Sequence, residues 1–191
     1  EDFGINIEQQ EQVYTVPGNQ TFVSPGFRQA EGDWSNAAFF LTASSLGSSV
    51  TCTGLNPASK QGDKAIVELL QQIDENERRE EEREIDETQI PDLVPILSVK
   101  AALTPGTTRI TGAARLRIKE SDRLSAMAKN ITALGGDIHI LPDGLLIHGG
   151  TLKGGKVNGY NDHRIVMSMA IAATCCQNSV IITGAEAVNK S

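Results

Sequence analysis

The chain has 191 residues, 39% of them hydrophobic, and a formal net charge of −7, so it can form one large or two small globular domains. It contains no apolar stretch long enough to span a bilayer, no arginine-rich tail and no stripe of interleaved aromatic residues. The composition therefore argues against a membrane-spanning helix in these residues and against nucleic acid as a partner.

The cysteines are Cys52, Cys175 and Cys176. They lack the spacing of metal ligands, and two adjacent cysteines in an apolar helix do not favour a structural disulfide. No secretory signal is visible at the N-terminus. We therefore expect a reducing, cytoplasmic setting.

One local pattern occurs three times. Each copy runs from an aspartate at a predicted helix start, through an apolar stretch, to a Thr-Gly pair and then a lysine. Aspartate and glycine are 21, 20 and 22 residues apart, and the lysine follows the glycine after 6, 7 and 6 residues. The pairs are Asp33 and Gly54, Asp92 and Gly112, and Asp162 and Gly184. Matched spacings of this kind indicate an internal repeat.

In the first copy, Asp33 is expected to lead an apolar helix around residues 37–41, buried on nearly all sides. The β-branched run at 49–53 predicts a strand, and residues 64–73 predict a second helix. The acidic run 75–84 follows, inside a stretch from 74 to 87 whose nine acids and three arginines carry −6 of the net charge. We expect it to be a solvated helix extension or loop rather than a binding tail, and to replace two strands of the repeat.

In the second copy, Asp92 follows Pro91 at a predicted helix start. Residues 107–111 predict a strand and residues 121–134 a helix. Gly135-Gly136 ends that helix, and the turn sequence Pro142-Asp143-Gly144 then predicts a β-hairpin. The strands of this hairpin are expected at 137–141 and 145–148.

In the third copy, Asp162 leads an apolar helix at 165–172, and residues 179–183 predict a strand. The repeating unit is therefore α-β-α-β-β, about 60 to 70 residues long, which is too small to bury its own core. We predict an α/β fold in which such units pack about a common axis.

Charged residues gather at the ends of these elements, most densely at 117–123, where cations and anions surround Ser121. Such a cluster can bind an anion and move a proton. The chain resembles the C-terminal part of the 5-enolpyruvylshikimate-3-phosphate synthase family. The segments that carry the resemblance, in the family's order, are 31–38 (EGDWSNAA), 90–93 (IPDL), 115–124 (RLRIKESDRL), 161–164 (NDHR) and 185–191 (AEAVNKS). Only the acidic run departs from the pattern.

The resemblance implies an inside-out α/β barrel, with helices inside and sheets outside and repeated units about a pseudo-threefold axis. Residues 1–30 would end a first domain and approach its hinge, and residues 31–191 would form the second domain without its final helix. The chain is then expected to be a partial piece, inactive without the missing N-terminal domain.

The activity implied is transfer of the enolpyruvyl (carboxyvinyl) group from phosphoenolpyruvate to the 5-hydroxyl of shikimate 3-phosphate, with release of phosphate. This is the step of chorismate and aromatic amino acid biosynthesis that glyphosate inhibits. Both substrates are small anions, and no metal and no organic cofactor is expected. Two alternatives stay open, the sister transferase that acts on UDP-N-acetylglucosamine and a non-catalytic ligand-binding or assembly module.

By resemblance, Asp92 and Glu120 are the catalytic residues that move protons. Read without the resemblance, Asp92 could be only a helix cap, and Glu120 could form an exposed ion pair worth under about 1 kcal/mol. His163 could cap a helix or carry a proton. His139 and His148 are predicted to be solvent-facing strand residues without a function.

The resemblance assigns phosphoenolpyruvate to Arg123, Arg164 and Lys190. Arginine forks suit a ligand that carries both a carboxylate and a phosphate, and lysine adds a point charge. Shikimate 3-phosphate would contact Lys119 and Arg115 together with the catalytic aspartate. As single residues, Arg164 and Lys190 would more often be surface charges, and Lys119 could equally be a solvated helix charge. Arg115 lies where other members of the family place a different polar residue.

Overall fold

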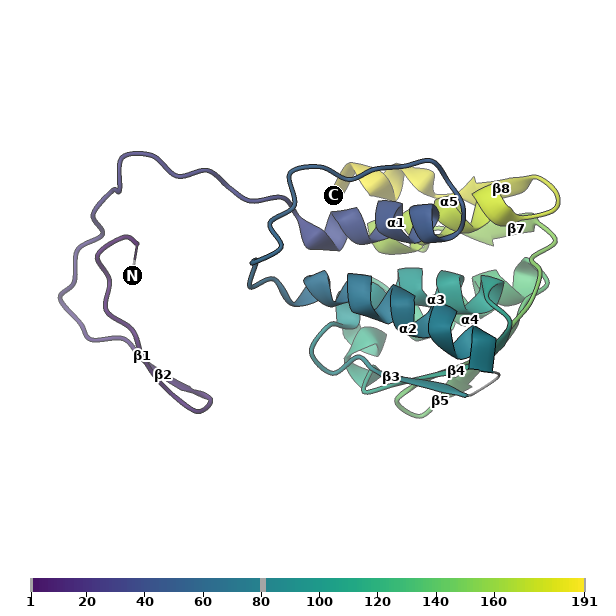
Figure 1. Cartoon of the computed structure of the whole chain (residues 1–191), viewed down its shortest axis with the longest axis horizontal. Coiled ribbons are helices and arrows are strands. Elements are labelled where there is room, and N and C mark those ends of the chain that lie inside the picture. Colours follow the sequence, from purple (N-terminus) through teal and green to yellow (C-terminus); the bar gives the residue numbers. More distant parts are fainter. Residues whose placement is uncertain (1, 80–81, 191) are drawn as a thin grey trace. The chain divides into compact units, whose positions relative to one another are not determined.

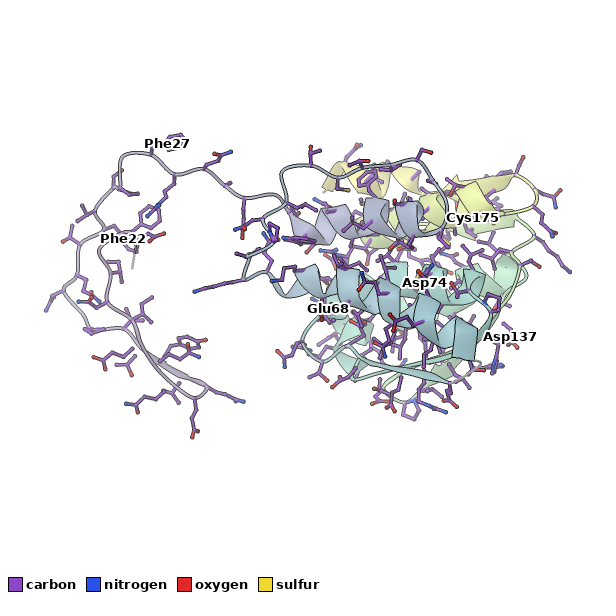
Figure 2. The ribbon with its side chains drawn as sticks, viewed as in Figure 1. Phe22, Phe27, Glu68, Asp74, Asp137 and Cys175 are labelled. Atoms are coloured by element: carbon purple, nitrogen blue, oxygen red, sulfur yellow. The ribbon has the colours of Figure 1, made fainter. Side chains whose placement is uncertain are left out.

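In the computed structural model, the described residues are 2–79 and 82–190, and the side chains of residues 76–79 and of Lys190 are not among them. The chain divides into two compact units, Glu1–Glu31 and Gly32–Ser191. The first contains a short antiparallel hairpin of β1 (Glu8–Gln10) and β2 (Val13–Thr15). Many of its apolar side chains are exposed, among them Phe22 and Phe27 (Figure 2).

The second unit is a mixed α/β domain whose helices lie inside and whose sheets lie outside (Figure 1). Its longer helices are α1 (Trp34–Ser45), α2 (Ile66–Arg79), α3 (Val94–Leu103), α4 (Arg123–Ala133) and α5 (His163–Cys175). Among the described residues, no helix has both the length and the apolar content to cross a membrane.

Helix α3 is the centre of the core, because its residues from Val94 to Ala102 are all buried and it packs against α1, α4 and α5. The one buried cation of α3 is Lys100. Its Nζ lies 2.6 Å from the carboxylate of Asp74 in α2, which is labelled in Figure 2, and 3.3 Å from the main-chain oxygen of Ser45 in α1. A buried ammonium needs such partners. The lysine thereby joins three helices.

A four-stranded sheet lies beside α2, α3 and α4 in the order β3-β4-β6-β5 (Figure 1). Its strands are β3 (Arg83–Asp86), β4 (Gly106–Thr111), β5 (Asp137–Leu141) and β6 (Gly144–Gly149). β3 pairs with β4 in parallel, and the other pairs are antiparallel. The predicted hairpin and the strand at 107–111 are therefore confirmed. A Cβ on Gly144 would overlap the main-chain oxygen of Ile110 in β4, and one on Gly149 would overlap that of Thr104 at the end of α3, so glycine is required at both positions.

A second sheet consists of β7 (Gly155–Asn158) and β8 (Val180–Thr183), which pair in parallel. β8 confirms the strand predicted at 179–183. β7 was missed, because its glycine-rich sequence is typical of a turn. The 3-10 helices are η1 (Gly62–Ala65), η2 (Pro91–Leu93), η3 (Ala114–Ile118) and η4 (Ala185–Lys190).

The strand predicted at 49–53 is wrong. This segment is irregular and mostly exposed, and no strand of the described chain lies beside it to take up its hydrogen bonds. The first unit of the repeat instead keeps one strand, β3, at the end of the acidic run. Its burial alternates, with Arg83 and Ile85 buried and Glu84 and Asp86 exposed. The strand was not predicted, because its buried position 83 is an arginine and the sequence there does not alternate between apolar and polar residues.

Helix α2 extends to Arg79, past the predicted end at residue 73. The acidic run is therefore a helix extension over its first part, as expected, while residues 80 and 81 lie outside the described residues. The prediction of buried helices at 37–41 and 165–172 holds for most positions. Phe40 and Ala170 are the exposed exceptions.

Candidate active site

Three helix starts converge on one charged cluster. Asp162 caps α5 by accepting from the main-chain nitrogen of Arg164 at 3.0 Å, and Asp122 caps α4 by accepting from that of Ser125 at 3.1 Å. Short polar side chains before apolar helices favour such caps. The two caps fix where the first residues of each helix point, and among these residues are Arg123 and Arg164.

The guanidinium of Arg123 is the centre of the cluster. Its side chain is 1% exposed and binds three carboxylates from three segments of the chain. Nε donates to Asp162 Oδ2 at 2.8 Å, Nη1 to Asp92 Oδ1 at 2.8 Å and Nη2 to Glu120 Oε2 at 2.7 Å. The five donors of arginine lie in one plane, so a single side chain can hold three acids in fixed positions.

Asp92 is surrounded by cations. Besides Arg123, its carboxylate lies 3.1 Å from Arg164 Nη2 and 3.6 Å from Lys119 Nζ. Burial acts most strongly on its pKa and raises it, but Arg164, Lys119 and Arg123 together outweigh burial and hold the pKa of Asp92 below its ordinary value. The carboxylate is therefore ionised at neutral pH.

The suggestion that helix capping alone explains Asp92 is wrong. Asp92 lies in the first turn of η2, whose N-cap is Ile90, and no side chain forms a capping hydrogen bond there. Its two oxygens face arginine and lysine side chains instead. The carboxylate of Asp92 therefore forms ion pairs and does not cap the helix.

Asp162 is the buried anchor of the cluster. Its side chain is fully buried and accepts from Ser121 Oγ at 3.0 Å as well as from Arg123 and from the backbone of α5. Burial raises its pKa most, but the hydrogen bond and charge of Arg123, with Ser121, bring the pKa below the ordinary value. The sequence predicted only its capping role. The feature of the sequence that could have indicated its place in the cluster is its position next to Arg164 in the segment 161–164.

Arg164 combines a fixed position with spare donor capacity. Its side chain is 12% exposed, and its Nη1 is buried without a hydrogen-bond partner among the described residues. Leaving such a donor unsatisfied costs about 1 to 3 kcal/mol, or more for a charged group. The geometry suits an anionic ligand that would accept from Nη1.

The other predicted site residues differ in their relation to the cluster. Lys119 and Glu120 lie at the edge of the cluster, with side chains 37% and 45% exposed. Within the described residues, Arg115 does not contact the carboxylates of the cluster. It donates to the main-chain oxygen of Thr88. The side chain of Lys190 is outside the described residues. The structure therefore brings together Asp92, Lys119, Glu120, Arg123 and Arg164.

A helices-inside α/β domain with charged helix starts meeting at one point is what the resemblance to the enolpyruvyl transferases predicted. The family model of EPSP synthase (3-phosphoshikimate 1-carboxyvinyltransferase) matches residues 1–191, and the chain belongs to this family. The resemblance and the fold class are thereby confirmed.

Similar proteins agree. A 3-phosphoshikimate 1-carboxyvinyltransferase of Clostridium acetobutylicum is 48% identical over 200 residues, which cover 99% of this chain and 46% of that protein. One of Clostridium perfringens is 42% identical, covering 100% and 48%. The solved EPSP synthase of Acinetobacter baumannii superposes with a TM-score of 0.79 at 26% identity, over 98% of this chain and 49% of that one. The chain thus spans about half the length of the relatives it matches.

Proposed function

We propose that this chain supplies one half of the active site of a 3-phosphoshikimate 1-carboxyvinyltransferase. The reaction would move the enolpyruvyl group of phosphoenolpyruvate to the 5-hydroxyl of shikimate 3-phosphate and release phosphate, as a step of chorismate biosynthesis. The observation that carries the proposal is the position of Asp92, ionised and held among Arg123, Arg164 and Lys119 at a cluster built from the family's motifs.

The chemistry requires a proton to leave the hydroxyl, one to be added to the methylene carbon and one to be removed from the same carbon. The 5-hydroxyl oxygen bonds to C2 of phosphoenolpyruvate and loses its proton, while the methylene carbon gains one, which gives a tetrahedral adduct. The bond from C2 to the phosphate oxygen then breaks, and a proton leaves the methyl group to restore the vinyl carbon. The departing phosphate takes up the proton that the hydroxyl lost. We assign the hydroxyl proton to Asp92 and the carbon protons to Glu120; before substrate binds, both carboxyl groups contact Arg123.

Binding of phosphoenolpyruvate would change the basicity of Asp92. The ligand brings a carboxylate and a phosphate, which would pair with its proposed ligands Arg164 and Arg123. With these cations engaged elsewhere, the influence that lowers the pKa of Asp92 weakens and burial raises it again. The aspartate would become a better proton acceptor only when the substrate is present.

The proposed ligands of phosphoenolpyruvate are Arg164, through its unpartnered Nη1, together with Arg123 and Lys190. Arg123 already holds three carboxylates, so an incoming anion must take the place of one of them. Glu120 is the most exposed of the three, at 45%. Its displacement would free it for proton transfer.

Lys119 and Asp92, with Arg115, are proposed to contact shikimate 3-phosphate. The rest of that pocket would come from a further domain, since the chain spans about half the length of its relatives. The matched family favours this acceptor over UDP-N-acetylglucosamine.

We place the protein in the cytoplasm, which agrees with the free thiols of Cys52, Cys175 and Cys176.

A chimera tests the proposal. This chain replaces the matching 46% of the Clostridium acetobutylicum relative, and phosphate release is measured with both substrates. We expect turnover by the chimera and little or none by the chain alone, because the substrate pocket is shared between the halves. Turnover with UDP-N-acetylglucosamine in place of shikimate 3-phosphate, or none with either acceptor in a folded chimera, would contradict the proposal.

A further inference from the structure

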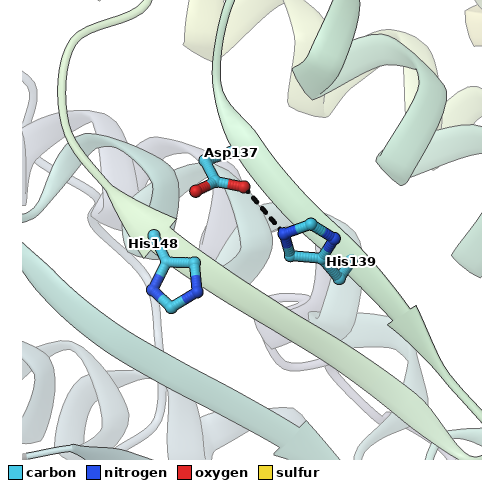
Figure 3. A group of neighbouring side chains, drawn as sticks. All are labelled: Asp137, His139 and His148. Carbon is cyan, nitrogen blue, oxygen red and sulfur yellow. Dashed lines mark ion pairs between the residues drawn. The ribbon is translucent and has the colours of Figure 1, made fainter.

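A second group of chemically competent side chains lies on the exposed surface of the hairpin β5–β6. Asp137 and His139 come from β5 and His148 from β6, and all three are exposed (Figure 3). One ligand atom of each lies within 4.8 Å of those of the other two. They belong neither to the charged cluster nor to the family motifs. Their arrangement therefore needs a separate explanation.

The strand register produces this arrangement. Thr107 of β4 pairs with His148 of β6, and His148 pairs with Asp137 of β5, so these three residues form a row across three strands. His139 lies two residues after Asp137 and so projects from the same surface of the sheet. Its Nε2 is 2.9 Å from Asp137 Oδ1, and the two imidazole rings have centroids 6.1 Å apart.

Thr107 orients one of the rings. Its Oγ1 lies 3.0 Å from Nδ1 of His148, so a ring that donates from Nδ1 keeps the lone pair of Nε2 for a metal. Histidine ligands of metal ions commonly donate their second ring nitrogen to a neighbouring oxygen, which fixes the ring and its tautomer. The row thus contains both a ligand and the residue that orients it.

We propose that Asp137, His139 and His148 bind a divalent transition metal ion of the Zn²⁺ type. Two imidazoles and one carboxylate suit Zn²⁺, Co²⁺ and Ni²⁺, and a water molecule would complete a four-coordinate site. Mg²⁺ and Ca²⁺ prefer oxygen ligands and would bind poorly. Because β5 is the edge strand of its sheet, the ion would join that edge to β6 and stabilise the hairpin.

Zinc titration of the full 191-residue chain, followed by calorimetry, tests the site. We expect one equivalent of Zn²⁺ to bind and to be lost in His139→Gln and in His148→Gln, with affinity lowered at least about 100-fold. The third histidine provides the matched control, since His163→Gln lies on α5 and should keep that equivalent. Thr107→Val removes only the orienting oxygen and should weaken binding about 10- to 100-fold.

The same variants give a second readout. Zn²⁺ should raise the thermal midpoint of the unaltered chain and of His163→Gln, whereas Mg²⁺ should not. His139 is exposed, so its replacement should leave the far-ultraviolet circular dichroism unchanged. Zinc binding that survives both His139→Gln and His148→Gln, as binding by the cysteines would, overturns the proposal. So does a chain that binds Zn²⁺ no more tightly than Mg²⁺.

Discussion

Replacing Asp92 with Asn, or Glu120 with Gln, is expected to lower the turnover of the chimera by about 10²- to 10⁴-fold, the usual contribution of a positioned acid or base. Both substitutions keep the size of the side chain and remove its ability to exchange a proton. Phosphoenolpyruvate affinity should change much less in either variant. It should even rise in Asp92→Asn, since Arg164 and Arg123 lose a competing anion.

The control for this experiment is Asp122→Asn. Asp122 lies in the same segment as Glu120 but caps α4, and asparagine caps a helix about as well as aspartate. Steady-state kinetics with both substrates should show turnover near that of the unaltered chimera. If Asp92→Asn or Glu120→Gln turns over as fast as Asp122→Asn does, the assignment of proton transfer to that residue is wrong.

The second large effect is expected at Glu87, whose replacement by Gln should remove a marked loss of stability as the pH rises from 4.5 to about 8. Its side chain is fully buried just after β3, and both carboxyl oxygens lack a hydrogen-bond partner among the described residues. Burial, with the nearby charges of Asp63 and Asp86, raises its pKa from 4.5 to about 8. The folded chain therefore holds this carboxyl in its neutral form at pH 7.

The direction of the pH effect follows from proton binding. Between pH 4.5 and about 8 the folded state keeps a proton on Glu87 that the unfolded state has lost, so unfolding becomes easier as pH rises. The stabilisation is complete below pH 4.5 and gone above about pH 8, and it amounts to roughly 3 to 5 kcal/mol. The Gln variant stays neutral at every pH and should lack this decline.

Urea unfolding of the chain at a series of pH values from 5 to 9 measures this difference directly. The matched control is Glu84→Gln, an exposed position of β3 in the same segment. It should follow the unaltered chain. Parallel curves for Glu87→Gln and Glu84→Gln would mean that Glu87 ionises in the folded state as readily as a surface acid.

The effect also concerns the candidate active site. The main chain of Glu87 forms hydrogen bonds with Thr111 and Ile90 and so positions the segment that leads to Asp92.

Much of the fold could be predicted from local signals. The turn sequence Pro142-Asp143-Gly144 defined the hairpin, and the aspartates before apolar runs located the starts of α1 and α5. Elements that depend on a distant partner could not be found in this way. Residues 49–53 have the composition of a strand, but no strand of the described residues pairs with them. β3 and β7 have atypical sequences and gain their hydrogen bonds from β4 and β8.

The candidate site shows the same division. Sequence motifs indicated which charged residues to expect, and five of them lie together, although their roles stay predictions. The depth of Arg123, at 1% exposure with three carboxylates around it, depends on how three helix starts pack. The neighbourhood of Asp137, His139 and His148 depends on strand register. No local pattern in the sequence contains either kind of information.

The most direct measurement of whether the charged cluster binds the dianionic substrate is a titration of the chimera with phosphoenolpyruvate in the presence of shikimate 3-phosphate. Arg164→Leu removes the buried, unpartnered donor, and Arg109→Leu removes an exposed guanidinium that pairs with Glu82 on the sheet. We expect Kd to rise about 10- to 100-fold in Arg164→Leu, as loss of a charged hydrogen bond predicts, and to stay unchanged in Arg109→Leu. Equal affinity in the two variants would show that phosphoenolpyruvate binds elsewhere.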